Sequence, residues 1–98
     1  MGLIRARVRV YGRVQGVFFR QNTAHQAELL CISGWVRNCD DGSVEALFEG
    51  EEEAVEKILE WCGNGPRAAR VEKVDVERTD VERVLVPKKK FGSFEIKH

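Results

Sequence analysis

Apolar and charged side chains alternate along residues 3–11. One face of this segment is apolar, and the other carries arginine at every second position before ending in Tyr11. This period of two predicts a β-strand with one buried face. The next residues, 12–20, read GRVQGVFFR, and their glycines predict a turn over 12–18. Helical spacing then predicts a helix from about Phe19 to Leu30, with a buried stripe of Phe19, Thr23, Ala24, Ala27 and Leu30.

The middle of the chain predicts a hairpin followed by a second helix. Two strand-like runs, at about 33–38 and 43–49, are joined by the turn sequence CDDG. The segment EEEAVEKILEWC, at 51–62, has apolar residues at helical spacing, and its three leading glutamates favour the positive end of a helix. The sequence GNGP then ends this helix.

Two further strands complete the predicted elements. Residues 70–78 form a strand with Val74 and Val76 inward, and SFEIK at 93–97 is a short final strand after a loop over 80–92. The order strand, helix, strand, strand, helix, strand predicts an α+β, ferredoxin-like βαββαβ fold. Its antiparallel sheet would have the order 4-1-3-2 plus the short C-terminal strand, with both helices on one face. We expect a single domain over residues 1–98.

Composition and charge reduce the number of functional classes to which this protein could belong. With 43% apolar and 33% charged residues, the chain is predicted to be globular rather than disordered. Its formal net charge of zero argues against a surface that attracts nucleic acid or anionic lipid as a whole. No apolar run approaches the ~20 residues that span a membrane, and MGLIRARVRV lacks a signal-peptide core. We therefore expect a cytoplasmic monomer that binds neither membrane nor nucleic acid.

The cysteines and histidines predict no metal centre. Cys31, Cys39 and Cys62 show neither metal-ligand nor redox spacing, and the only histidines are His25 and His98. Without an export signal, the cysteines are expected to be reduced thiols of a cytosolic protein. No cofactor and no metal are predicted.

The segment GRVQGVFFR has the features of an anion site. A loop that leads from a strand into a helix offers backbone N–H groups without helical partners, and the helix dipole adds positive potential. Gly16 would let the backbone curl, and Gly12 would permit a sharp exit from the strand. Arg20, on the first helical turn, could close over the same anion. The loop pattern alone is weak evidence, however, and by itself favours an ordinary turn in which Arg13 and Arg20 are solvated.

The predicted topology favours the anion site over the ordinary turn. The first and second strands run parallel, with only the third strand between them, so their C-terminal ends reach the same edge of the sheet. Arg20 follows the first strand and Asn38 ends the second. Two strand spacings are about 10 Å. We therefore expect a phosphate between them to contact both side chains.

Two long motifs resemble the signatures of a known family. GRVQGVFFR at 12–20, followed by GWVRNCDDGSVEALFEG at 34–50, closely resembles the two signatures of the acylphosphatases. The similarity covers nearly the whole chain, including GPRAARVEKV at 65–74 and the short final strand. The resemblance implies hydrolysis of acyl phosphates to a carboxylate and inorganic phosphate by in-line attack of water, without a metal or a covalent intermediate. Inorganic phosphate would then be both product and inhibitor.

The resemblance also assigns roles to individual residues. It implies that Arg20 binds phosphate and that Asn38 positions the attacking water. It also implies that the loop holds phosphate oxygens through backbone N–H groups, namely those of Val14, Gln15, Gly16, Val17, Phe18 and Phe19. Three positions depart from the family pattern: Cys39, where threonine is common; Cys31, where the helix often ends in glycine; and His98, where an aromatic residue is frequent.

Two other classes of function stay open at this point. One is a phosphate- or acyl-phosphate-binding module without catalysis, and the other is an RNA-binding domain on the same fold. Arg5, Arg7 and Arg9 could serve an RNA surface, but RNA binders of this fold stack bases on aromatic residues of the first and third strands. The third strand has acidic residues at outward positions, so cross-strand ion pairing is the simpler interpretation. Lys88–Lys90 are interpreted as a solvated loop, and Asp40 and Asp41 as turn residues.

Overall fold

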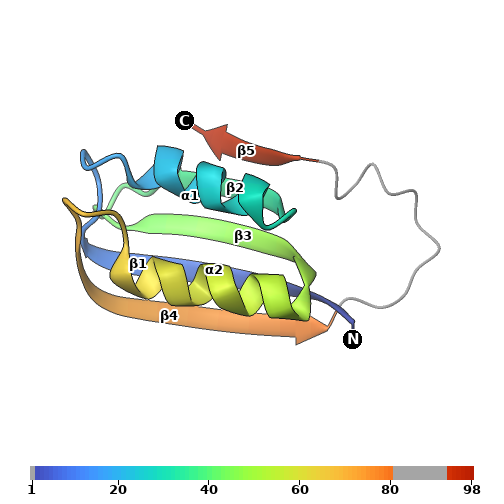
Figure 1. The fold of residues 1–98 in the computed structure, drawn as a ribbon. Coiled ribbons are helices and arrows are strands. Elements are labelled where there is room, and N and C mark those ends of the chain that lie inside the picture. Colours follow the sequence, from blue (N-terminus) through green and yellow to red (C-terminus); the bar gives the residue numbers. More distant parts are fainter. Residues whose placement is uncertain (1, 81–92) are drawn as a thin grey trace.

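One five-stranded sheet covered by two helices forms the body of the molecule (Figure 1). A computed structural model describes residues 2–80 and 93–98. The elements follow in the order β1 (Leu3–Arg13), α1 (Phe19–Leu29), β2 (Ser33–Asn38), β3 (Val44–Glu51), α2 (Glu52–Asn64), β4 (Arg70–Asp80) and β5 (Phe94–Lys97). The strand order β4-β1-β3-β2-β5 contains the predicted order 4-1-3-2. The α+β, ferredoxin-like arrangement is therefore confirmed.

The fifth strand makes the sheet mixed. β1 pairs antiparallel with both β3 and β4, and β2 pairs antiparallel with β3. β5, in contrast, pairs parallel with β2, with Trp35 opposite Glu95 and Val36 opposite Ile96. The sheet is thus antiparallel across its first four strands only. This parallel edge strand brings the C-terminal end of the chain to the edge where β1 and β2 also end (Figure 1).

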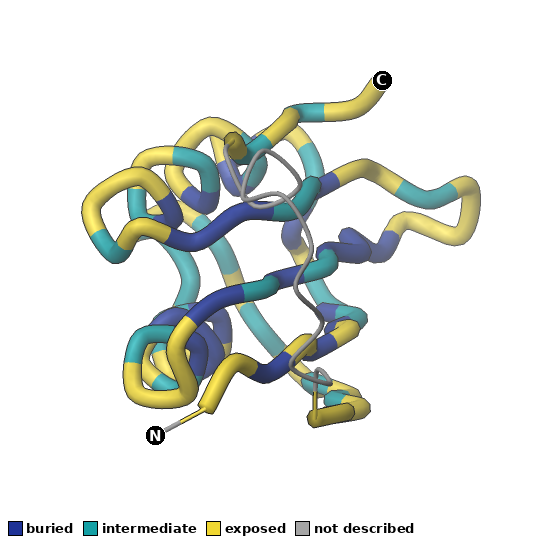
Figure 2. Tube along the Cα trace, turned by 90° about the vertical axis from the view of Figure 1, so that its right-hand side faces the viewer, coloured by how far each residue is buried: buried dark blue, intermediate teal, exposed yellow. Residues whose placement is uncertain are grey.

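The core lies between the sheet and the helices because the apolar face of each strand meets the apolar stripe of each helix. Val8, Phe48 and Ile58 are completely buried there. Figure 2 shows the buried layer along the strands and the facing sides of the helices, while the turns are largely exposed. Of the predicted stripe of α1, Phe19, Thr23 and Ala27 are buried, whereas Ala24 and Leu30 are only partly buried. The apolar positions predicted for the second helix are confirmed, because α2 buries Val55, Ile58, Leu59 and Cys62.

Gly12 has a different role from the one predicted. It does not end the first strand, because β1 continues through Arg13. The register between β1 and β4 shifts between Tyr11 and Gly12, and Gly12 has a φ of 124°. A Cβ atom at Gly12 would lie 2.1 Å from the carbonyl oxygen of Arg70. Glycine is therefore required for the close approach of two strands at a bulge.

The remaining boundaries differ from prediction by a few residues. α1 ends at Leu29, α2 runs slightly later than the predicted 51–62, and β4 continues to Asp80. The ends of a helix are harder to predict from sequence than its middle, because the terminal turns make fewer hydrogen bonds. The predicted loop over 80–92, with Lys88–Lys90, lies outside the described residues except for Asp80.

Candidate active site

A small cavity of about 150 Å³ lies where the β1–α1 turn meets the end of β2. Its lining combines both predicted catalytic side chains with four residues of the predicted phosphate loop and one further glutamine: Val14, Gly16, Phe18, Phe19, Arg20, Gln21 and Asn38. Arg20 and Asn38 are far apart in sequence, and the fold brings them to one site. The cavity is smaller than the ~300–1,000 Å³ of ordinary small-molecule sites, so it suits a compact group such as phosphate.

Three buried side chains anchor the turn between β1 and α1 in the core. Val14, Val17 and Phe19 are buried, whereas Gly16 and Phe18 between them are exposed. Gly16 has a φ of 75° and Phe18 a φ of 63°, so the backbone enters the left-handed region twice within three residues. Such alternation of backbone conformation turns successive N–H groups toward a common centre, which is the geometry of an anion-binding nest.

The N-terminus of α1 adds further unpaired donors to the site. The first intrahelical hydrogen bond runs from the backbone N–H of Asn22 to the carbonyl of Phe18, at 3.1 Å. The N–H groups of Phe19, Arg20 and Gln21 therefore have no acceptor within the helix. No side chain caps this end of the helix, and its first turn contains no acidic residue. An anion in the cavity would meet these donors and the positive end of the helix dipole.

Arg20 is held by the last residues of the chain. Its Nη1 donates a hydrogen bond to the carbonyl oxygen of Lys97 at 3.0 Å and lies 3.2 Å from Nδ1 of His98. These contacts exist because β5 lies beside β2 and ends next to the first turn of α1 (Figure 1). One nitrogen of the guanidinium is thereby anchored to the protein, which restricts the orientation of the group that faces the cavity.

Gln15 connects the two halves of the site. Its Nε2 donates hydrogen bonds to the carbonyl oxygens of Cys39, at 2.8 Å, and Ser43, at 2.9 Å. Both acceptors belong to the turn that follows Asn38. The prediction for Gln15 concerned its backbone N–H group; its side chain is engaged with this turn, and Gln15 is absent from the lining described above. Val17 is likewise buried in the core and does not line the cavity.

Asn38 is the last residue of β2 and is exposed. It lies opposite Val44 of β3, and the turn after it is closed by the N–H of Cys39, which donates to the carbonyl of Ser43 at 2.8 Å. β1 and β2 both run antiparallel to β3, so they are parallel to each other, as predicted. This arrangement places Asn38 in the lining of the same cavity as the β1–α1 turn.

The turn between β2 and β3 is stabilised by Asp41. Its carboxylate accepts hydrogen bonds from the backbone N–H and the hydroxyl of Ser43, and it pairs with Arg9 at 3.4 Å. The hydrogen bonds from Ser43, supported by the charge of Arg9, lower the pKa of Asp41. Asp41 is therefore a turn residue, as its sequence position indicated.

The face of the sheet without helices carries ion pairs. Arg5 pairs with Glu49, and Arg37 donates two hydrogen bonds to Oε1 of Glu45, at 2.9 and 2.6 Å. Glu45 is only 7% exposed, and its hydrogen bonds raise the pKa of Arg37. The Arg5–Glu49 pair agrees with the cross-strand interpretation for Arg5, whereas Arg9 of the same strand pairs with Asp41 in the β2–β3 turn.

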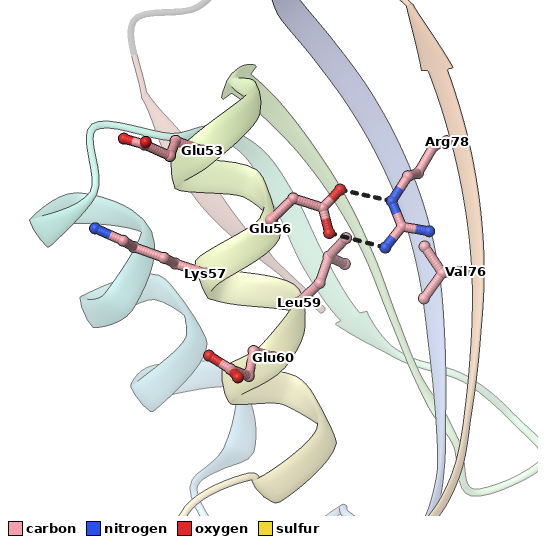
Figure 3. A pocket seen from close by; sticks show the side chains of 7 residues that line it. All are labelled: Glu53, Glu56, Lys57, Leu59, Glu60, Val76 and Arg78. Atoms are coloured by element: carbon pink, nitrogen blue, oxygen red, sulfur yellow. Dashed lines mark hydrogen bonds and ion pairs between the residues drawn. The ribbon is translucent and has the colours of Figure 1, made fainter.

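A larger hollow, of about 540 Å³, lies between α2 and β4 (Figure 3). Figure 3 shows Glu56 and Arg78 paired across it, with nitrogen–oxygen distances of 2.7 and 2.9 Å, and Glu53 and Glu60 on the same helix. The hydrogen bond from Arg78 lowers the pKa of Glu56. Arg78 is already paired, and the three lining glutamates outnumber the two lining cations, Arg78 and Lys57, so the charge of the hollow is unfavourable for anions. This hollow is therefore a poor phosphate site despite its size.

Residues 2–80 and 93–98 contain no group of three or more His, Cys, Asp or Glu side chains placed to hold a metal ion. All three cysteines are free thiols, and burial raises the pKa of Cys62 to about 12. No helix in the same residues is long and apolar enough to cross a membrane.

Sequence reasoning missed two parts of the site. Gln21 lines the cavity, and its position beside Arg20 on the first helical turn was the available signal. The contacts of Lys97 and His98 with Arg20 had no such signal, because they depend on the pairing of β5 with β2.

Fold and site together describe a small α+β protein with a cavity at a strand–helix turn whose N–H donors and Arg20 could hold a phosphate-like anion. Comparison with known proteins specifies the family. The acylphosphatase family model matches residues 6–96. The chain is 62% identical to an acylphosphatase of Rubrobacter xylanophilus over 74% of this chain and 66% of the relative, and 57% identical to one of Natronomonas pharaonis over 83% and 88%. This protein belongs to the acylphosphatase family.

Solved structures agree with this assignment. The crystal structure of acylphosphatase from Bacillus subtilis matches with a TM-score of 0.84 and 36% identity, covering 97% of this chain and 99% of that one. An acylphosphatase from Coxiella burnetii matches with a TM-score of 0.83 and 34% identity, covering 98% and 94%. The resemblance of the two sequence motifs to this family is thus confirmed.

Proposed function

We propose that this protein hydrolyses the carboxyl–phosphate bond of acyl phosphates, giving a carboxylate and inorganic phosphate by in-line attack of water. The observation that carries the proposal is the shared cavity of Arg20 and Asn38 at the uncapped N-terminus of α1. One side of this cavity offers positive charge and N–H donors, and the other offers a carboxamide. Membership of the acylphosphatase family supports the same reaction.

The chemistry requires positioning and charge stabilisation more than acid–base catalysis. A carboxylate is a good leaving group, so little protonation is needed as the bond to phosphorus breaks. In a loose phosphoryl-transfer transition state, negative charge is spread over the three equatorial oxygens. Arg20 and the N–H groups of the β1–α1 turn would stabilise this charge, since they are fixed before the substrate binds.

Asn38 is proposed to orient the attacking water. An amide is not basic, so Asn38 cannot remove a proton. Its carboxamide can accept one hydrogen bond from the water and donate another, which fixes the direction of attack. We infer that the proton of the water passes to a phosphate oxygen of the substrate.

Release of phosphate from acetyl phosphate and benzoyl phosphate, with EDTA present, tests the proposal. Arg20→Ala is expected to lose activity and inhibition by inorganic phosphate together. Asn38→Ala is expected to lower kcat by at least ~100-fold, about 2.7 kcal/mol, while inorganic phosphate binds within a few-fold of wild type. Arg13→Ala is the matched control, because Arg13 is an exposed cation beside the same turn that does not line the cavity.

Four results would contradict parts of this assignment. Wild-type protein that binds inorganic phosphate but turns over neither substrate would be a phosphate-binding module rather than an enzyme. Near-normal phosphate affinity of Arg20→Ala, or an equal loss in Arg13→Ala, would place the anion site elsewhere. Full turnover by Asn38→Ala would exclude the water-orienting role.

The cellular compartment, the oligomeric state and the inhibition by product are also proposals. We expect a cytoplasmic monomer with inorganic phosphate as a product inhibitor. Sedimentation at micromolar concentration would test the monomer, and competition kinetics with inorganic phosphate would test the inhibition. Fractionation of cells that contain the tagged protein would test the compartment.

A further inference from the structure

The contact between Arg20 and His98 requires one protonation state of the histidine. Nη1 of Arg20 lies 3.2 Å from Nδ1 of His98. A guanidinium has N–H donors and no acceptor, so the imidazole nitrogen must accept this hydrogen bond. Nδ1 can accept only when it carries no proton, which is the case in the neutral imidazole with its proton on Nε2. The contact therefore exists only while His98 is neutral.

Two hydrogen bonds from Nη1 fix the orientation of the guanidinium. The same nitrogen donates to the carbonyl oxygen of Lys97 at 3.0 Å. Because Nη1 carries two N–H groups, one can serve Lys97 and the other His98. The N–H groups on Nε and Nη2 can then serve an anion in the cavity that Arg20 lines. With a single hydrogen bond at Nη1, the group would be free to rotate about it.

Protonation of His98 breaks this arrangement. A proton on Nδ1 replaces the acceptor with a donor, and it places a positive charge beside the guanidinium, which repels it. His98 is exposed, so its ring can turn away into solvent. Histidine is the side chain that ordinarily changes its charge between about pH 5 and pH 8. One of the two hydrogen bonds that orient Arg20 is therefore sensitive to pH.

The charged side chains of the sheet lie on the opposite face from this contact. β5 packs chiefly against β2 and α1. The charged residue of β2 is Arg37, which lies opposite Lys97 in the register of the two strands. Both cations lie over the ring of Trp35, on the face of the sheet without helices. Glu95 lies opposite Trp35 and shares that face. His98, in contrast, meets α1 on the face that the helices cover.

Within α1, Arg20 is the charged residue at the contact. The two other titratable residues of this helix are His25 and Glu28. At a rise of about 1.5 Å per residue, they lie about 7.5 Å and 12 Å further along the helix axis than Arg20. A proton on His98 therefore acts most directly on Arg20.

We infer that His98 is a positioning residue for Arg20 that acts only as a neutral imidazole, so that its protonation in mildly acidic solution releases the guanidinium and lowers kcat. This inference rests on the proposed hydrolysis of acyl phosphates. His98 does not line the cavity, so it acts through Arg20 rather than on the substrate. The imidazolium charge also attracts an anion, which offsets part of any loss in affinity. We therefore expect kcat to respond more than phosphate affinity does.

The ratio of kcat between wild type and His98→Gln tests the inference, measured with benzoyl phosphate from about pH 5 to about pH 8. The glutamine oxygen can accept the hydrogen bond from Arg20 and stays neutral throughout. The ionisation of the substrate cancels in the ratio. His98→Lys carries a positive charge over the whole range. His25→Gln is the matched control, because it removes the other histidine of the chain.

His98→Gln should match wild type near pH 8, whereas near pH 5 wild type should fall about 3-fold to 10-fold below the variant, the effect of one lost hydrogen bond. His98→Lys should be less active than His98→Gln at every pH. Affinity for inorganic phosphate should differ between wild type and His98→Gln by less than about threefold. A kcat ratio that does not change with pH would overturn the inference. So would a His98→Lys variant as active as His98→Gln, or the same pH dependence in the ratio of wild type to His25→Gln.

Nuclear magnetic resonance of the phosphate-free protein separates this inference from the proposed function. The Cζ signal of Arg20 should shift with pH in parallel with the ring signals of His98, and it should stay constant in His98→Gln. An Arg20 signal that does not follow the titration of His98 would overturn the inference even in an active enzyme. If wild type turns over neither acetyl phosphate nor benzoyl phosphate, the proposed hydrolysis fails, and the Arg20 signal still decides whether His98 positions the guanidinium.

Discussion

At the scale of single residues, the site depends on side chains whose partners are backbone atoms. Arg20 is anchored by the Lys97 carbonyl, and Gln15 by the carbonyls of Cys39 and Ser43. Carbonyl acceptors stay in place when surface side chains change, so they hold functional groups in fixed positions. The result is a preorganised site, which is what a reaction that relies on charge stabilisation requires.

Gln15 is expected to act on catalysis through Asn38. Gln15→Met keeps the shape of the side chain but removes both donors. Without these two hydrogen bonds, the turn that follows Asn38 is no longer linked to the β1–α1 turn. We therefore expect kcat to fall roughly tenfold. Affinity for inorganic phosphate, measured by calorimetry, should stay within a few-fold, since Arg20 and the N–H groups of the turn remain.

A double-mutant cycle distinguishes this positioning role from a general loss of structure. If Gln15 acts through Asn38, Gln15→Met should lower kcat less than about threefold in an Asn38→Ala background. The same tenfold loss in both backgrounds would contradict the coupling. Thermal unfolding of each variant monitors its stability.

At the scale of elements, two turns contribute to the stability of the fold. One is the C-terminal end of α1. The N–H of Ile32 donates to the carbonyl of Ala27 at 2.8 Å, and that of Cys31 to Glu28 at 3.2 Å, which is the Schellman arrangement. Cys31 occupies its left-handed position with a φ of 57°. The family pattern often has glycine at this position, and the structure supplies the physical reason.

Cys31→Gly is expected to stabilise the protein. Glycine removes the left-handed penalty of about 1–2 kcal/mol, and its greater freedom in the unfolded chain offsets part of this gain. A net gain of about 0.5–1 kcal/mol should appear as a higher urea midpoint at unchanged slope. Cys31→Ala, which keeps a Cβ atom, should show no such gain, and equal stabilisation by both variants would exclude the conformational explanation.

The turn between β2 and β3 should make stability depend on acidic pH. Hydrogen bonds from Ser43 and the charge of Arg9 lower the pKa of Asp41, so the folded state favours its ionised form. The associated stability is present above the unfolded carboxyl pKa of about 3.9 and is lost as the pH falls through the folded pKa. Asp41→Asn should therefore lower the melting temperature at neutral pH, and the difference from wild type should shrink in acid.

Melting temperatures of wild type and Asp41→Asn across acidic to neutral pH measure this effect. Asp40→Asn is the matched control, because it removes the same charge from the neighbouring position. A difference between wild type and Asp41→Asn that does not change with pH would show that the carboxylate of Asp41 is not responsible.

At the scale of the whole molecule, β5 connects the end of the chain to the active site. It pairs with β2 at the edge of the sheet, and Phe94 stacks on Phe48 with ring centroids 5.8 Å apart. Lys97 and His98 then meet Arg20. A parallel edge strand of only a few residues thus contributes both to packing and to the orientation of Arg20, the arginine proposed to bind phosphate.

Removal of residues 94–98 should impair the site more than the fold. The core between the first four strands and the helices remains, so circular dichroism should still show a folded protein, although a less stable one. Arg20 loses its anchors, and we expect phosphate affinity to fall roughly tenfold, comparable with the loss of one charge-assisted contact. In an Arg20→Ala background, the same truncation should change phosphate affinity little. Wild-type affinity in the truncated protein would contradict the role of β5.

Much of this architecture was predictable because it rests on local periodicity and on chain order. Alternation along β1 and helical spacing along α2 each indicate which face is buried, and the order of elements then limits the topology. The C-terminal ends of β1 and β2 had to meet at one edge of the sheet. The sequence alone therefore predicted that Arg20 and Asn38 would lie together.

The contacts that orient these groups were decided only by the tertiary structure. The carboxamide of Gln15 could have faced the cavity, but the spacing of the two turns places it between the carbonyls of Cys39 and Ser43. Gly12 is needed because the backbone of β4 lies against it at a bulge, not because the strand ends there. Arg20 meets Lys97 because β5 pairs parallel with β2. Periodicity specifies which face of an element is buried, whereas such contacts depend on register and distance between segments remote in sequence.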